Sequence, residues 1–100
     1  MIKQISFLHV ACPDAVRAQV AERLDSMHLF GNRLDSITAR LHKSRENYEV
    51  ELVAQAGPAG TLVAKSATGD LLAAVDAAID RLTQQLRRQH GIKVSRRKHA

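Results

Sequence analysis

The sequence predicts an α+β fold with the element order β-α-β-β-β-α, in which two helices pack on one face of a four-stranded sheet. Two observations predict it. In the central part of the chain, apolar and polar residues alternate, which is the period of half-buried strands. Toward the C-terminus, apolar residues recur every three or four positions, which is the period of an amphipathic helix. A length of 100 residues fits one domain.

The N-terminal part is expected to form a strand followed by a helix. Residues 2–10 are rich in β-branched and apolar types, which favours a strand. Pro13 and Asp14 favour a helix start, because proline suits the first helical position and an acidic side chain stabilises the positive end of the helix dipole. The apolar face of this helix, expected over 13–27, is formed by Val16, Val20, Leu24 and Met27.

Three strands joined by short turns are expected next, as an antiparallel meander. They are expected over 36–42, 48–54 and 61–67. The alternation places Arg40, His42 and Lys65 on the outer face of the sheet. Glu49 and Glu51 fall on the same face, where they can neutralise these cations across the strands.

The last helix is the clearest element. Its apolar stripe is formed by Leu72, Val75, Ile79, Leu82 and Leu86. Acidic residues lie in its first half and basic residues in its second half, which complements the helix dipole. Gly91 is expected to end it. We therefore expect a domain over 1–91 and a basic, disordered tail over 92–100.

The positive charge is concentrated at the C-terminal end. The chain has 15 Lys and Arg against 10 Asp and Glu, a formal net charge of +5. Seven of the basic residues and no acidic residue lie between Arg81 and Ala100. A basic end on a nearly neutral body favours a polyanionic partner, with nucleic acid first and an anionic membrane surface second. A tail that only aids solubility is the alternative.

No cofactor, metal site or catalytic site is predicted. His9 and Cys12 are close in sequence, but no second pair completes a metal site. The chain has neither a glycine-rich phosphate loop nor a nucleophile motif. Asp76 and Asp80 lie one helical turn apart, and we interpret them as surface charges. We therefore expect a non-enzymatic protein without a small-molecule substrate.

A cytoplasmic location is expected. The N-terminus lacks the charged start, long apolar run and cleavage site of a signal peptide. No segment approaches the ~18 consecutive apolar residues of a membrane span. Cys12 is the single cysteine, so it cannot form an internal disulfide, which fits a reducing compartment.

The exposed side of the last helix is the candidate RNA-binding surface. At about 100° per residue, Arg81 and Arg88 fall opposite the apolar stripe, with Gln84 between them. Arg87 flanks the stripe. Such a cationic ridge suits a phosphate backbone, whereas an ordinary solvated helix face is the alternative. Aromatic residues are scarce, at 3%, which disfavours base stacking and favours the backbone and shape of folded RNA.

Three segments carry a family resemblance. The run from Gly69 to Arg88 is similar to the last helix of a known family, whose pattern is Asp-Met-Tyr-x-Ala-Ile-Asp followed by Asp-Lys-Leu-x-x-Gln-Leu. Residues 13–24 are similar to the first helix of the same family, and residues 60–65 to its fourth strand. Together, over residues 2 to about 90, they resemble the ribosome hibernation promoting factors and the related ribosome-associated inhibitor. The fold expected for this chain is a sandwich like that of double-stranded-RNA-binding domains. The chain departs from the family at Leu71-Leu72, where Met-Tyr is usual, and at Asp25-Ser26, where lysine is common.

The resemblance implies a stationary-phase factor that binds rRNA of the small ribosomal subunit in the decoding channel and blocks access of tRNA and mRNA. It points to the short form, which works with a ribosome modulation factor to promote ribosome dimers and is monomeric off the ribosome. Carried over by position, the family's basic residues are Arg23, Arg81 and Arg88. The complete expected RNA-binding set is Arg23, Arg81, Gln84, Arg87, Arg88 and Lys93.

Two other functions stay open from the sequence. One is a protein-interaction regulator of a transcription factor, and the other is a generic domain that binds structured RNA. The first predicts a partner complex that survives nuclease and moderate salt, whereas RNA binding through phosphates weakens steeply as salt rises.

Overall fold

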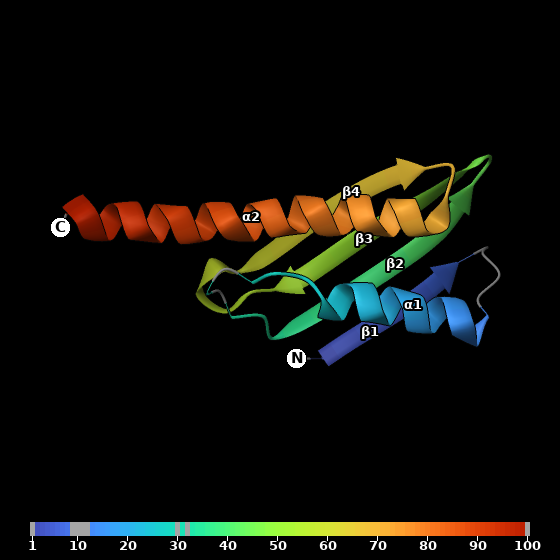
Figure 1. Cartoon of the computed structure of the whole chain (residues 1–100), viewed down its shortest axis with the longest axis horizontal. Helices are drawn as coiled ribbons and strands as arrows, with labels where there is room; N and C mark the ends of the chain where they lie inside the picture. Colours follow the sequence, from blue (N-terminus) through green and yellow to red (C-terminus); the bar gives the residue numbers. More distant parts are fainter. Residues whose placement is uncertain (1, 9–12, 30, 32, 100) are drawn as a thin grey trace.

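The computed structural model describes residues 2–8, 13–29, 31 and 33–99, with side chains described as far as Gln89. The elements, in chain order, are β1 (Ile2–Leu8), α1 (Asp14–Asp25), β2 (Ser36–Ser44), β3 (Asn47–Gln55), a short 3-10 turn η1 (Gly57–Ala59), β4 (Thr61–Thr68) and α2 (Leu71–His99). Both helices lie on one face of the sheet (Figure 1). The predicted α+β fold and its β-α-β-β-β-α order are confirmed.

The sheet has the strand order β1-β2-β3-β4. β2, β3 and β4 form the predicted antiparallel meander, because short turns connect them. β1 pairs in parallel with β2, as expected when a helix carries the chain back to the start of the next strand. In this register Glu51 lies opposite Arg40 on one side and opposite Lys65 on the other.

The core lies between the sheet and the helices. The inward residues of β2 alternate with outward ones as predicted, and Ile37, Ala39 and Leu41 are buried. From α2, Val75, Leu82 and Leu86 are fully buried. Burying a side chain of this size contributes about 1.5–3 kcal/mol, so this stripe fixes α2 on the sheet. The partly buried aromatic rings of Phe7 and Tyr48 pack against the same cluster.

The start of α2 is capped by a side chain. A carboxylate oxygen of Asp70 accepts a hydrogen bond from the Ala73 N–H at 2.9 Å. This satisfies one of the backbone donors that a helix start leaves without a partner. The Ser66 hydroxyl of β4 donates to the Ala74 carbonyl, which ties the first turn of α2 to the sheet.

The end of α2 differs from the expectation. The helix continues through Gly91 to His99, so the prediction that it ends at Gly91 is wrong. A glycine inside a helix costs only about 1 kcal/mol relative to alanine, and no proline follows to stop the helix. Its last turns extend beyond the sheet (Figure 1). The division into a domain over 1–91 and a tail over 92–100 stays a prediction.

α1 is shorter than expected, because it ends at Asp25 rather than at Met27. The Ser26 hydroxyl donates to the Arg23 carbonyl at 2.9 Å, a local bond that competes with further helix. Met27 is still buried in the core, as its spacing predicts. The expected strand residues 9–10 and Cys12 lie outside the described residues.

Candidate nucleic-acid interface

Arg81 and Gln85 of α2 lie against β4, the strand at one edge of the sheet. The Arg81 guanidinium donates through Nη1 to the Lys65 carbonyl, and Gln85 donates through Nε2 to the Val63 carbonyl at 2.8 Å. Arg81 is exposed, as the helical spacing predicts, but its side chain bends back to the sheet edge. One of its five N–H groups is used in this bond, so others remain for a ligand.

Gln84, Arg87 and Arg88 are exposed on the middle turns of α2. They lie beside Leu86, the last buried residue of α2 among those whose side chains are described. Within the described part of the chain, no carboxylate forms an ion pair with Arg87 or Arg88. These two arginines therefore supply free positive charge at the place where the sequence predicts it. The side chain of Lys93 lies outside the described residues.

Arg23 of α1 is placed differently from the arginines at the end of α2. Its Nε donates to a carboxylate oxygen of Asp76 on α2 at 2.9 Å. At 1.5 Å per residue, Asp76 and Arg87 are about 16 Å apart along the helix axis. The structure therefore brings Arg81, Gln84, Arg87 and Arg88 together over 81–88 of α2, and it leaves Arg23 apart from them, paired with Asp76.

The helical layer is not uniformly basic. α1 and the first turns of α2 carry the carboxylates of Asp14, Glu22, Asp25, Asp70, Asp76 and Asp80. The cations near them are tied to other groups. Lys3 pairs with Asp25, Arg23 pairs with Asp76, and Arg17 donates to the Ile5 carbonyl at 2.9 Å. The cationic surface of the described residues is therefore the stretch 81–88 of α2, not the whole helical face.

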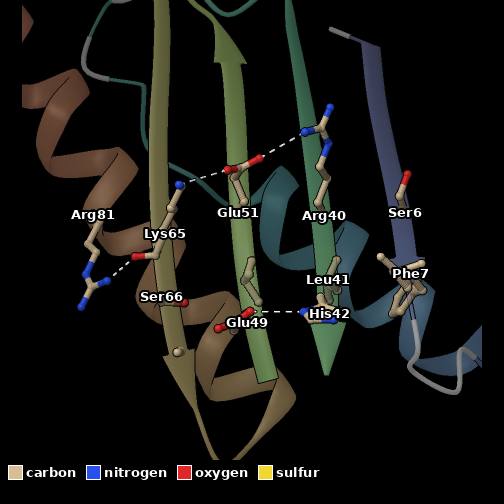
Figure 2. Close-up of a pocket in the computed structure, with 13 residues that line it drawn as sticks. Ser6, Phe7, Arg40, Leu41, His42, Glu49, Glu51, Lys65, Ser66 and Arg81 are labelled. Atoms are coloured by element: carbon tan, nitrogen blue, oxygen red, sulfur yellow. Dashed lines mark hydrogen bonds and ion pairs between the residues drawn. The ribbon is translucent and has the colours of Figure 1, made fainter. Parts of the chain in front are cut away.

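The outer face of the sheet carries the charge pairs that the strand alternation predicts (Figure 2). The two carboxylate oxygens of Glu51 lie 3.3 Å from Arg40 Nη1 and 3.5 Å from Lys65 Nζ. In the next row, His42 Nδ1 lies 3.2 Å from a carboxylate oxygen of Glu49. Arg40 and Lys65 are not among the predicted RNA-binding residues, although the same alternation places both on this face, where they lie on either side of Glu51.

Two features are absent from the described residues. Among them, no three His, Cys, Asp or Glu side chains are grouped so that they could hold a metal ion. No helix in the described part of the chain is both long and apolar enough to span a membrane.

The structure defines a class of small α+β domains in which a four-stranded sheet is backed by two helices, here with a cationic end on the second helix. The chain belongs to the family described as sigma 54 modulation protein / S30EA ribosomal protein, whose model matches residues 3–93. This confirms the family resemblance of the sequence. The family consists of ribosome-associated factors and is not a class of enzymes.

Solved structures support the same assignment of fold. A ribosomal subunit interface protein from Coxiella burnetii superposes with a TM-score of 0.83 at 20% identity, covering 91% of this chain and 99% of that one. The N-terminal domain of Protein Y from Thermus thermophilus superposes with a TM-score of 0.75 at 25% identity, covering 87% of this chain and 96% of that one. A search of curated proteins finds no match.

Proposed function

We propose that this protein binds rRNA of the small ribosomal subunit in the decoding channel and thereby blocks tRNA and mRNA, which inhibits translation in stationary phase. The observation that carries the proposal is the exposed pair Arg87 and Arg88, which no carboxylate of the described residues neutralises. Membership in a ribosome-associated family supplies the class of partner. The contact set is Arg81, Gln84, Arg87, Arg88 and Lys93, with Arg23 at a second position.

The mechanism needs no covalent step. Guanidinium groups form charge-assisted, often bidentate hydrogen bonds with phosphates, and Gln84 adds neutral donors between them. Each neutralised phosphate releases condensed counterions, so affinity falls as salt rises. Once docked, the folded domain excludes tRNA and mRNA by its volume. Inhibition therefore follows from occupancy alone, without turnover and without a cofactor.

We further propose that the protein is monomeric off the ribosome and that a ribosome modulation factor acts beside it in forming ribosome dimers. The hydrogen bonds at the sheet edges support the monomer. Arg81 and Gln85 occupy carbonyls of β4, and Arg17 occupies the Ile5 carbonyl of β1. Side chains that occupy edge carbonyls hinder a second chain from adding a strand to the sheet.

Co-sedimentation with purified small subunits over a salt series tests the proposal. If about five phosphates are contacted, log affinity should fall against log salt with a slope of about −4. The variant Arg87→Gln with Arg88→Gln should bind more weakly and with a shallower slope. The matched control, Lys43→Gln with Arg45→Gln, removes the same charge from the end of β2 and the turn that follows it, and should bind like wild type. Equal binding by both variants, with no salt dependence, would contradict the proposal.

A regulator of a transcription factor is the second candidate, because the family description includes sigma 54 modulation. It predicts a protein complex that survives nuclease treatment and moderate salt.

A competition experiment distinguishes a generic domain that binds structured RNA from a ribosome factor. Excess unrelated folded RNA should not displace the protein from small subunits if the proposed site is specific.

A further inference from the structure

We infer that the outer face of the sheet is a second phosphate-contacting surface, made by Arg40 and Lys65 and continuous with Arg81. The inference rests on the proposed function, because it takes the same partner, the sugar-phosphate backbone of RNA. It extends the contact set from the helix, across the β4 edge, to a face that neither helix covers.

The first step is the alignment of charges across the strands. Arg40, Glu51 and Lys65 occupy directly opposed positions on β2, β3 and β4. Arg81 joins this row from α2, because its guanidinium bonds to the backbone carbonyl of Lys65 itself. Figure 2 shows the side chains of Arg40, Glu51 and Lys65 following one another across the strands, with that of Arg81 beside Lys65. Three cations therefore share a row with one carboxylate.

The second step is the difference in exposure within the row. The side chains of Arg40 and Lys65 are 67% and 72% exposed, whereas that of Glu51 is 29% exposed. The carboxylate lies low between two cations whose charged ends reach solvent. A ligand that approaches from outside meets the guanidinium and ammonium groups first. The net charge of Arg40, Glu51 and Lys65 is therefore positive by one, and Arg81 adds a further positive charge.

The third step is the shape and composition of this face. A hollow of about 820 Å³ lies over the charged rows, and its lining includes three cations, Arg40, Lys65 and Arg81, and two carboxylates, Glu49 and Glu51. Phe7 also lines it, but its ring packs against the core cluster. The outward ring on this face is the His42 imidazole, whose Nδ1 lies 3.2 Å from a carboxylate oxygen of Glu49, and no Phe or Tyr ring of the described residues stands there as a stacking platform for bases. Charge complementarity therefore favours phosphates as the groups that fill the hollow.

A substitution of Glu51 tests the inference, because it should raise affinity for small subunits, whereas a purely structural role of Glu51 predicts no rise. If phosphates contact this face, the Glu51→Gln variant removes a repelling charge and frees two cations. Its affinity for small subunits should rise, by about fivefold for one unscreened contact of about 4 Å in water. A Glu51 that serves only as a surface ion pair leaves affinity unchanged. The matched control is Glu46→Gln, which makes the same charge change in the exposed β2–β3 turn.

The companion variant is Arg40→Gln with Lys65→Gln, measured over the same salt series. Loss of two phosphate contacts should make the log–log slope shallower by about 1.8 and weaken binding at least tenfold at moderate salt. Thermal unfolding should show both sheet variants folded, because exposed ion pairs add little stability.

Unchanged affinity in both sheet variants, together with weakened binding in the Arg87→Gln, Arg88→Gln variant, would overturn the sheet surface and leave the proposed function standing. Unchanged affinity in all three variants would overturn both. A rise for Glu51→Gln and a fall for the Arg40, Lys65 variant would establish the second surface.

Discussion

The two halves of α2 differ in charge and in what their side chains contact. The first half carries Asp76 and Asp80, and Asp76 neutralises Arg23 of α1. The second half carries Arg87 and Arg88, which no carboxylate of the described residues neutralises. Charge count alone would treat the three arginines alike. The difference teaches that a cation can bind a polyanion only to the extent that the fold leaves it without an internal counterion.

The largest expected effect is on the buried stripe that both halves share. Leu82 is fully buried, so Leu82→Ala should lower the free energy of unfolding by about 3 kcal/mol. Chemical denaturation measures this value. A cost below about 1 kcal/mol would show that α2 is not held on the sheet as described, and the comparison of its two halves would then lose its basis.

The next largest effect is expected on RNA binding by the second half of α2, which carries Arg87 and Arg88. Arg88→Glu should weaken binding to small subunits on the order of 30-fold, because a charge-assisted hydrogen bond to phosphate contributes about 2 kcal/mol. The midpoint of unfolding should stay near that of wild type, since Arg88 is exposed. Arg45→Glu, in the β2–β3 turn, controls for net charge. Equal losses in both variants would indicate a general charge effect rather than a site.

A smaller effect on affinity, of opposite sign, is expected for the first half of α2, where Asp76 pairs with Arg23. Asp76→Asn frees the Arg23 guanidinium and removes a negative charge, so affinity for small subunits should rise about threefold. Asp80→Asn removes the same charge one turn further along α2 but leaves the pair with Arg23 intact, and it should raise affinity less. A loss of affinity for Asp76→Asn would mean that Asp76 positions Arg23 for the ligand instead of neutralising it.

The smallest effect tests where α2 ends. If the helix continues through Gly91, Gly91→Ala should stabilise it by up to about 1 kcal/mol and increase helical circular dichroism. If Gly91 instead ends the helix in a left-handed conformation, alanine is unfavourable there and helicity should not increase.

The fold was predictable because its signals are local. Alternation in β2 and β3 is sufficient to place Arg40 and Glu51 on one face, and the register then pairs them. The stripe of α2 likewise follows from its spacing. These features depend on strand and helix periods, which the sequence carries directly.

The candidate site was predictable only in part, because its contacts are not local. Arg23 and Asp76 are 53 positions apart, and their pairing depends on how α1 and α2 pack. The bond from Arg81 to the Lys65 carbonyl depends on the reach and rotamer of a long side chain. The helix period gives the side of α2 on which Arg81 lies, but not the group that it contacts. Gly91 was misleading because a helix tolerates one glycine.

Directed cleavage of rRNA tests the central claim most directly. In a Cys12→Ser background, a cysteine at position 84 or, as control, at position 18 on the exposed side of α1 would carry an iron chelate that generates hydroxyl radicals. Bound to small subunits, the probe at position 84 should cut rRNA of the decoding channel strongly, and the probe at position 18 should cut it weakly. Cleavage that is absent from position 84, or stronger from position 18, would contradict the assignment of 81–88 of α2 as the RNA-binding surface.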